Sequence, residues 1–319
     1  HVRSRRQRQM CIRDRGGPLK ETMMKFFVLC FGLLLAATSQ AAEIRIGAKV
    51  FTEQVILSEL TAQYLEPHGY QARIVGNLGS TIAWNAMKSG QLDLTWEYTG
   101  TSLVAYNKVT ERLDKEAAYQ RVKELDAKSG AIWLAPSRFN NTYALALPEK
   151  VAEENPDIHT ISDLAEALKK PGKGNRLLAL DIEFANRSDG LDGLVKEYGL
   201  SFTRNEIRQM DPGLVYTALR NGQVFVGLVY TTDGRLDSFG LRLLEDDRKY
   251  FPDYTAAPVV NADYLKQHPE LEALLKPLAE RLDDATMRRL NARVDVDRET
   301  PAVVAADFLR QEKLIGEGN

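Results

Sequence analysis

Four tyrosines in this chain stand at predicted strand ends or beside turn residues, where a ligand could reach them: Tyr98, Tyr143, Tyr230 and Tyr254. Aromatic faces suit a quaternary ammonium group, because that cation has no N–H to donate and is attracted by the ring quadrupole. Each ring contributes roughly 0.5–2 kcal/mol when water is excluded. Taken singly, each of these tyrosines is better explained as a half-buried packing residue than as a ligand-binding one. The four together predict an aromatic box that holds a cation.

A zwitterionic ligand would also need a partner for its carboxylate. Arg187 lies in the segment 183–190, which follows a predicted strand and opens a helix, a natural position for an anion. Its planar guanidinium can hold a carboxylate through two parallel hydrogen bonds. Lys49, just past the first strand, and Thr101 add a charge and a hydroxyl. A surface ion pair between Arg187 and Glu183 is the alternative, and the residues alone leave both open.

The sequence lacks the usual patterns of catalysis and metal binding. Three histidines follow residue 41, all in predicted turns or helix ends and none at metal-ligand spacing: His68, His159 and His268. The chain has no glycine-rich phosphate loop, nucleophile elbow or zinc motif. Asp93 and Glu97 lie four apart on a strand, where capping or solvent roles suit them better than acid–base chemistry. We therefore predict a protein with no cofactor and no metal that is not an enzyme.

The N-terminal 41 residues are expected to be absent from the mature protein. Residues 23–41 combine an early lysine, an apolar run over 26–37 and small residues two apart, which is the pattern of a secretory signal peptide. The run is short for a bilayer span, so a membrane anchor is the weaker alternative. Residues 1–22 are interpreted as a non-native leader, with a native basic arm as the alternative. The protein is thus predicted to be periplasmic.

Charge and cysteine content narrow the function further. Eight of the 42 basic residues and two of the 44 acidic residues lie in positions 1–41, which leaves 278 residues with a net charge near −8. A mildly acidic chain without basic clusters is not expected to bind nucleic acid. Both cysteines, Cys11 and Cys30, lie in the same segment, so disulfides and cysteine-bound metal are not expected in the mature protein. We expect a soluble monomer stabilised by its buried core.

Strands and helices alternate along the mature chain, which predicts an α/β fold with parallel sheets covered by helices. A helix is expected from Thr52, a capping box at residues 160–163, and an N-cap with proline at the first helical position at Asp211 and Pro212. Residues 269–314 are expected to be nearly all helix. The predicted strands are 43–48, 72–75, 92–98, 177–180 and 224–230.

One segment occurs twice. Residues 86–99 align without a gap with residues 218–231, and each copy predicts a helix end, a Gly-Gln turn, a buried strand and a Tyr-Thr pair. Chance similarity between two α/β segments is the alternative. Otherwise the repeat indicates two similarly built lobes, each with a tyrosine at the carboxyl end of a strand. That edge is where open α/β sheets bind ligands, so two facing edges would form a cleft.

Several segments resemble one family, in the family's order and over nearly the whole mature chain. The family comprises the substrate-binding proteins of osmoprotectant ABC importers, which take glycine betaine, choline, carnitine or proline betaine. The resemblance implies a type II periplasmic-binding-protein fold, with two α/β lobes joined by two crossing segments and a ligand cleft between them. The segments that carry it are 49–54, 97–101, 183–190, 230–234 and 252–258.

The resemblance also implies roles for residues and the extent of each lobe. The positions of the family's tyrosine box match the four tyrosines above, its carboxylate partners match Lys49, Thr101 and Arg187, and Glu183 matches an acidic residue close to the site. Asn141 stands where some members carry an acid, which puts a direct ligand role there in doubt. The first lobe is expected over 42–144 and 256–319, the second over 145–255, and the crossings near 143–147 and 254–258.

The predicted function is the capture of a small quaternary ammonium osmoprotectant, such as glycine betaine, and its delivery to an ABC permease in the inner membrane. An amino-acid-binding protein of the same fold is the main alternative, with Glu183 or Asp93 pairing a primary ammonium. A hydrolase with Glu183 as base is a third, and it lacks an accompanying nucleophile or metal. The residues predicted to bind ligand are Tyr98, Tyr143, Tyr230, Tyr254, Arg187, Lys49, Thr101 and Glu183.

Overall fold

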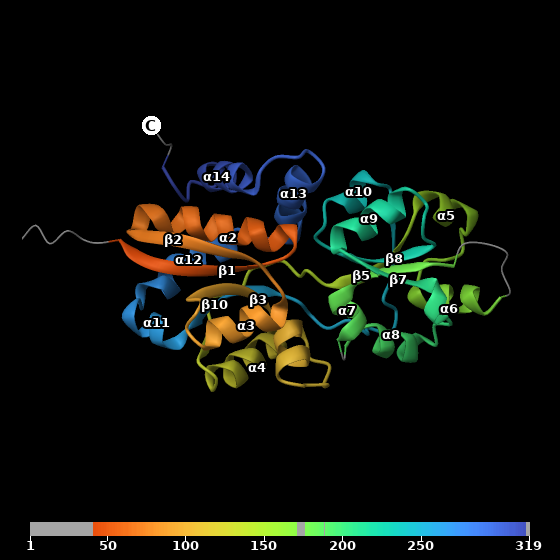
Figure 1. Cartoon of the computed structure of the whole chain (residues 1–319), viewed down its shortest axis with the longest axis horizontal. Coiled ribbons are helices and arrows are strands. Elements are labelled where there is room, and N and C mark those ends of the chain that lie inside the picture. Colours follow the sequence, from red (N-terminus) through yellow and green to blue (C-terminus); the bar gives the residue numbers. More distant parts are fainter. Residues whose placement is uncertain (1–40, 171–175, 188, 317–319) are drawn as a thin grey trace, which may run out of the picture. The chain divides into compact units, whose positions relative to one another are not determined.

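A computed structural model describes residues 41–170, 176–187 and 189–316. Within them, the chain forms two five-stranded sheets with helices on both faces, which confirms the predicted α/β fold (Figure 1). The leader, almost all of the signal segment and both cysteines lie outside the described residues. None of the helices in the described part is long and apolar enough to cross a membrane.

The first sheet has the strand order β2-β1-β3-β10-β4. Strand β1 pairs in parallel with β2 and β3, whereas β10 returns from late in the chain and pairs antiparallel with β3 and β4. The bounds are β1 Ala42–Lys49, β2 Tyr70–Leu78, β3 Leu94–Tyr98, β4 Ala131–Trp133 and β10 Ala256–Asn261.

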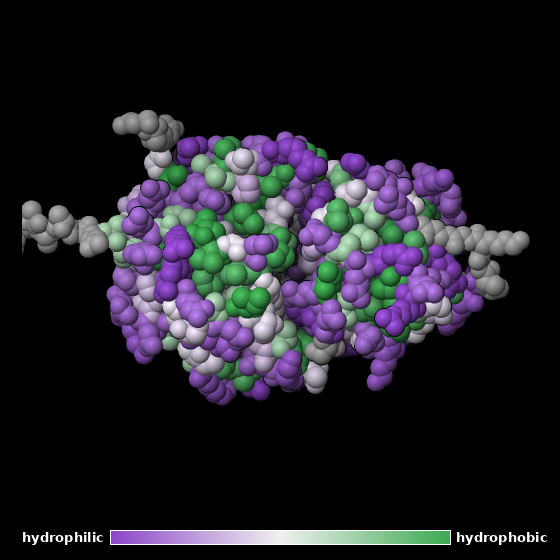
Figure 2. Space-filling view, in the orientation of Figure 1, coloured by the Kyte–Doolittle hydropathy of each residue, from purple (hydrophilic) through white to green (hydrophobic). Residues whose placement is uncertain are grey.

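Helices cover both faces of this sheet. In Figure 1, α2 and α14 lie on one side and α3 and α4 on the other. The edge strand β2 alternates between partly buried and exposed residues, and apolar side chains show over this region in the otherwise largely polar face of Figure 2. The helices are α2 Thr52–Leu65, a short 3₁₀ turn Glu66–His68, α3 Ser80–Lys88, a π-helix Thr101–Tyr106, α4 Lys115–Ala127, α11 Ala262–Gln267, α12 Glu270–Glu280, α13 Asp284–Asp295 and α14 Pro301–Gln311.

The second sheet has the order β7-β6-β8-β5-β9. Here β6 pairs in parallel with β7 and β8, and β5 runs antiparallel to β8 and β9. Its strands are β5 Tyr143–Leu147, β6 Leu178–Asp181, β7 Ile207–Met210, β8 Val226–Tyr230 and β9 Arg242–Leu244. Its helices are α5 Glu149–Glu154, α6 Ile161–Lys169, α7 Ile182–Asn186, α8 Leu191–Tyr198, a 3₁₀ turn Arg204–Glu206, α9 Pro212–Arg220 and α10 Arg235–Ser238.

The local helix signals were largely correct, and the expectation of wholly parallel sheets was wrong. Thr160 and Asp163 form the predicted capping box, and Asp211 caps α9 with Pro212 at its first position. Phe51, rather than Thr52, occupies the N-cap of α2, and the Thr52 hydroxyl donates instead to Asp295. Each sheet is mixed because β5 and β10 enter directly from the other sheet, without a crossover helix that would keep them parallel.

The two copies of the repeated segment adopt the same structure. One runs from the end of α3 through a turn to β3, and the other from the end of α9 to β8. Gly90 and Gly222 occupy equivalent turn positions with φ of 72° and 63°, a left-handed conformation that favours glycine. The Gly-Gln signal therefore marks a real structural requirement in both copies.

The chain passes between the sheets slightly earlier than predicted. Tyr143 already opens β5 and Ala256 opens β10, so the connections are residues 134–142 and 245–255. They run antiparallel beside one another, joined by a bridge between Asn140 and Thr255. The predicted crossing 143–147 coincides with β5, and 254–258 spans the end of the second connection and the start of β10, because each strand pairs with its sheet as soon as the connection ends.

Candidate functional site

A cavity of about 460 Å³ collects residues from the strand ends of both sheets. Every predicted site residue lines it except Arg187. Its wall comprises Lys49, Val50, Phe51, Asn77, Ser80, Tyr98, Thr101, Asn141, Tyr143, Asp181, Ile182, Glu183, Met210, Asp211, Pro212, Tyr230 and Tyr254. Residues that are up to 205 positions apart in the sequence therefore share one binding-sized space.

Aromatic rings form a continuous group on the wall of this cavity. The ring of Tyr143 lies 5.3 Å from that of Tyr230 and 5.2 Å from that of Tyr254, the latter edge to face at 87°. Phe51 stacks on Tyr230 with centroids 5.8 Å apart and lies 6.2 Å from Tyr98. These five rings, which we term the aromatic cage, include Phe51, which the sequence analysis had not identified.

Strand pairing explains how distant tyrosines meet. Tyr143 is the first residue of β5 and lies directly opposite Tyr230, the last residue of β8. In the other sheet Tyr98, the last residue of β3, lies opposite Ala256, which brings Tyr254 to the same end. Directly opposed residues on antiparallel strands project to one face, so the register itself aligns the rings.

Three cage tyrosines are fixed by hydrogen bonds to carboxylates. Tyr98 donates to Glu53 at 2.7 Å, Tyr230 donates to Asp181 at 3.1 Å, and Tyr254 donates to Asp189 at 2.9 Å. Burial raises the pKa of each of these phenols well above its ordinary value, so the rings stay neutral. The hydroxyl of Tyr143 has no hydrogen-bond partner among the described residues and is available to a ligand.

Arg187 is buried behind Tyr254 and does not face the open cavity. Its guanidinium makes two hydrogen bonds to Asp189, at 2.8 and 2.5 Å, and approaches Tyr254 Oη at 3.4 Å. The pair with Glu183 is longer, at 3.5 Å. Burial opposes the charge of Arg187, yet Tyr143, Tyr254 and Asp189 hold its pKa above the ordinary value. The principal partner of Arg187 is therefore Asp189. The sequence had suggested either a ligand carboxylate or Glu183 as the partner of Arg187, and not Asp189.

Lys49 and Thr101 both line the cavity, but among the described residues only Lys49 already has a side-chain partner. The Lys49 ammonium lies 2.6 Å from Glu97 in an ion pair whose side chains are 3% and 0% exposed, and it sits 5.2 Å from the centre of the Tyr98 ring. Glu97 also accepts from Tyr106 at 2.9 Å. The hydroxyl of Thr101 has no partner within the part of the chain that is described. The positive charge of Lys49 is thus already compensated, whereas the Thr101 hydroxyl is free.

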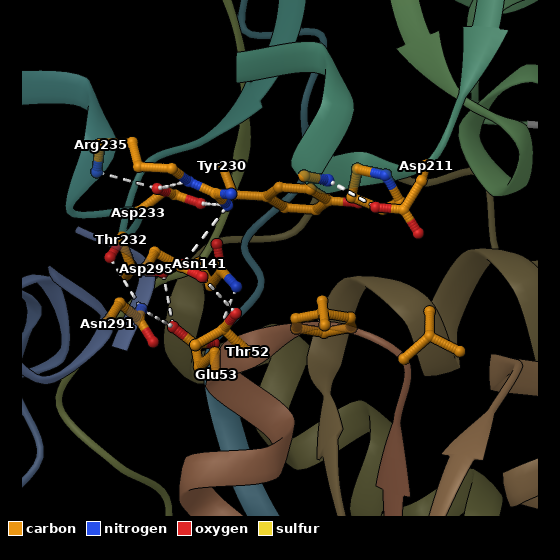
Figure 3. Close-up of a pocket in the computed structure, with 14 residues that line it drawn as sticks. Thr52, Glu53, Asn141, Asp211, Tyr230, Thr232, Asp233, Arg235, Asn291 and Asp295 are labelled. Atoms are coloured by element: carbon orange, nitrogen blue, oxygen red, sulfur yellow. Dashed lines mark hydrogen bonds and ion pairs between the residues drawn. The ribbon is translucent and has the colours of Figure 1, made fainter. Parts of the chain in front are cut away.

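Glu53 is the centre of a buried hydrogen-bond network beside the cage, which we term the Glu53 node. Its carboxylate accepts from Tyr98 at 2.7 Å. It also accepts from Asn141 at 2.7 Å, from Thr232 at 2.6 Å and from Asn291 at 3.3 Å, three residues that Figure 3 shows around it. Burial raises the pKa of Glu53, and the four hydrogen bonds oppose that rise. The node connects α2, the first connection between the sheets, the end of β8 and α13.

A second, more polar cavity of about 240 Å³ adjoins the cage on the other side of Phe51 and Tyr230. Figure 3 shows Arg235 paired with Asp233, whose carboxylate lies 2.5 Å away, and Arg235 also approaches Asp295 at 3.4 Å. This network joins the segment after β8 to the end of α13. One guanidinium is shared there by two carboxylates, those of Asp233 and Asp295.

The described histidines and Asp93 do not line the cavity. His68 and His159 are exposed and His268 is partly buried, and no cluster of His, Cys, Asp or Glu suited to a metal occurs in residues 41–170, 176–187 and 189–316. Asp93 pairs with Arg45 at 2.6 Å, away from the cavity. Asp93 and Glu97 thus have separate basic partners and do not form a carboxylate pair.

Two kinds of residue escaped the sequence analysis. Phe51 lies within the family-like segment 49–54 but carries no polar group that would draw attention. Asp181 ends β6 one residue after a predicted strand, and a polar residue at a strand's carboxyl end was a usable signal. Glu53 has no local signal, because its partners come from other elements. Asp189 lies only two positions from its partner Arg187, so that pair was within reach of a local argument.

Comparisons with known proteins identify similar chains. A family model described as the substrate binding domain of ABC-type glycine betaine transport systems matches residues 42–311. A glycine-betaine-binding protein of Pseudomonas aeruginosa is 56% identical over 91% of this chain and 94% of its own length. The glycine betaine-binding protein YehZ of Escherichia coli is 32% identical over 88% of this chain and 95% of its own length.

Solved structures agree with these sequence comparisons. A structure of a glycine betaine/carnitine/choline ABC transporter protein superposes with a TM-score of 0.69 at 33% identity, covering 85% of this chain and 99% of the other. Apo YehZ from E. coli superposes with a TM-score of 0.63 at 31% identity, covering 86% and 100%. The two-lobed periplasmic-binding-protein fold predicted from the sequence is thereby confirmed.

Proposed function

This chain belongs to the family of substrate-binding domains of ABC-type glycine betaine transport systems, and from that premise we propose that its cavity holds a small quaternary ammonium osmoprotectant such as glycine betaine. The observation that carries the proposal is the aromatic cage. Three phenol groups in it are held by carboxylates, so the ring positions are fixed before a ligand arrives. Preorganised rings lose little conformational entropy on binding.

Membership of a transport family confirms the prediction that the protein is a carrier and not an enzyme. Proteins of this kind bind a small ligand outside the cytoplasm and present it to an ABC permease. We further propose that this protein acts in the periplasm as a monomer, and that its permease lies in the inner membrane. The signal-like segment 23–41 and the negative charge of the remaining chain support this.

The cage supplies the affinity for the cationic end of the ligand. Several desolvated rings at roughly 0.5–2 kcal/mol each amount to a few kcal/mol before ordering costs. The free hydroxyls of Tyr143 and Thr101 can donate to a carboxylate or accept from an alcohol. Phe51 completes the wall where α2 begins, stacked on Tyr230.

Carboxylate binding by the predicted cations requires a change of partners. Lys49 is paired with Glu97, and Arg187 with Asp189 and Glu183. We propose that Arg187 turns part of its guanidinium toward the ligand carboxylate while Asp189 keeps the rest, since five donors exceed what one carboxylate can accept. The free hydroxyl of Thr101 would then donate to the ligand carboxylate. Glu183 would place an acidic side chain at the edge of the site.

Isothermal titration calorimetry of the purified protein tests the proposal directly. Glycine betaine, choline and carnitine are titrated separately, with glycine as the control for an amino-acid-binding protein of the same fold. We expect binding of at least one quaternary amine and no measurable binding of glycine, whose primary ammonium needs hydrogen-bond acceptors more than ring faces. Tight binding of glycine with no response to the quaternary amines would establish the alternative.

A further inference from the structure

Asp181 is a carboxylate on the cavity wall, and the binding mode proposed above gives it no role. It is the last residue of β6, its side chain is 97% buried, and it lines the cavity between Tyr143 and Tyr230. One oxygen accepts from the backbone N–H of Phe184 at 2.8 Å, which caps α7, and the other accepts from the Tyr230 hydroxyl at 3.1 Å. No basic side chain pairs with it within the described residues.

The charges around the cavity leave an excess of carboxylates. Lys49 is neutralised by Glu97, and Arg187 by Asp189. Of the other ionisable wall residues, Asp181, Glu183 and Asp211 are acidic. Glu183 has a 3.5 Å contact with Arg187, and Asp211 caps α9. Glu53 also contacts a cage ring but does not line the cavity, so Asp181 is the unpaired wall carboxylate that contacts a cage ring. In a site that excludes water, such a charge acts strongly on a bound cation.

We propose that Asp181 is a specificity-determining residue that supplies the counter-charge of the aromatic cage and biases it toward quaternary ammonium ligands with a net positive charge. This rests on the proposed function. A choline-like alcohol is a monocation and gains the full attraction of Asp181. A betaine is a zwitterion, so its own carboxylate is repelled by Asp181 while its ammonium is attracted. Asp181 therefore acts on the ratio of the two affinities.

The competing interpretation is purely structural, because Asp181 both caps α7 and holds Tyr230. The variant Asp181→Asn separates the two roles. Asparagine is as good an N-cap as aspartate, so α7 is kept while the charge is lost. Tyr230→Phe removes the same phenol hydrogen bond and leaves the carboxylate charged. Asp114→Asn is the matched control, since Asp114 caps α4 through the Ala117 N–H at 2.8 Å and does not line the cavity.

Calorimetric titrations of choline and of glycine betaine into the wild type and these three variants test the proposal. We expect Asp181→Asn to weaken choline binding by about tenfold and glycine betaine binding by no more than about threefold. Tyr230→Phe should change both by a similar small factor, and Asp114→Asn should change neither. Equal weakening of both ligands by Asp181→Asn would overturn the proposal and leave the proposed function intact. Wild-type protein that binds neither choline nor glycine betaine would overturn this proposal, and the proposed function would fall only if carnitine also failed to bind.

A pH series on the wild type tests the proposal without any variant, so its result does not depend on whether a variant folds. Burial raises the pKa of Asp181, with the Phe184 N–H and Tyr230 opposing the rise. A bound cation favours the ionised carboxylate and lowers that pKa again. Choline affinity should therefore be highest above the pKa of Asp181 in the free protein and fall as the pH is lowered through that pKa. Glycine betaine affinity should fall less.

Other groups that face Asp181 have to be considered in this series. The other carboxylates near the cage are Glu183 on α7, Asp211 at the start of α9 and Glu53 beside Tyr98. The cations Lys49 and Arg187 are paired with Glu97 and Asp189. Asp181→Asn removes only the contribution of Asp181. The proposal requires that its choline curve becomes as shallow as its glycine betaine curve. A choline curve that remains as steep as in the wild type assigns the effect to Glu183, Asp211 or Glu53 and overturns the proposal.

Discussion

Tyr98 and Tyr230 occupy the same position in the two copies of the repeated segment, yet their surroundings differ. Tyr98 is 4% exposed, and its hydroxyl joins the Glu53 node, where Gln54 also donates to it at 3.1 Å. Tyr230 is only partly buried and stacks on Phe51, with its hydroxyl on Asp181. Similar sequence thus produces the same strand end, while the contacts of each ring come from elements outside the repeat.

The comparison suggests different duties for the two tyrosines. Tyr98 belongs to a buried network that connects α2, α13 and the end of β8, so its environment chiefly serves the folded state. Tyr230 presents a face to the cavity and has fewer partners, so its environment chiefly serves the ligand. Substitutions in each environment should therefore affect different measurements.

The largest effect is expected at the node beside Tyr98. Glu53→Leu removes an acceptor that Tyr98, Asn141, Thr232 and Asn291 share, and it leaves the donors of Asn141 and Thr232 buried without another acceptor. We expect the free energy of unfolding to fall by about 3 kcal/mol, since each unsatisfied buried group costs about 1 kcal/mol or more. Chemical denaturation measures it. Glu59→Leu on the same helix is the control, with a change within about 0.5 kcal/mol. Equal effects would show that the node adds no stability.

Tyr230 should affect binding more than stability. Tyr230→Leu keeps apolar area and removes the π face, so we expect the affinity for a quaternary ammonium ligand to fall by about 1–2 kcal/mol, or about 5- to 30-fold. Tyr230→Phe retains the ring and should lose little. Calorimetry with the ligand that binds the wild type measures both. A Tyr230→Leu variant that binds like the wild type would contradict the cage.

The smallest effect should be the same in both copies of the repeat. Gly90→Ala and Gly222→Ala each force a left-handed conformation on a residue with a side chain, which costs about 1 kcal/mol. An added Cβ would meet no heavy atom within 4 Å at either position, so backbone strain alone decides the result. Thermal denaturation should show matching losses. Gly76→Ala, where φ is not positive and space is also open, is the control. Unequal losses would mean that the two turns are not equivalent.

Local patterns were sufficient for much of the architecture. The capping box at Thr160, the cap at Asp211 and the repeated turn depend on residues a few positions apart, so their physical causes are contained in short segments. Placing tyrosines at strand ends needed only the strand boundaries and the rule that ligands bind at that edge. Tyr98 and Tyr230 were found in this way, whereas the site role of Glu183 came from the family resemblance, and all three line the cavity.

Partner choice, in contrast, was decided only by the tertiary structure. Lys49 and Glu97 are 48 positions apart, and Glu53 and Asn291 are 238 apart, so no periodicity or spacing relates them. The antiparallel entry of β5 and β10 likewise depends on how the connections leave one sheet and meet the other. The amino-acid sequence by itself therefore determined which elements form and which residue types stand at their ends. Which carboxylate neutralises which cation, and hence which charges remain for a ligand, follows from distances that exist only once both sheets have formed, because electrostatic pairing depends on separation in space and not along the chain.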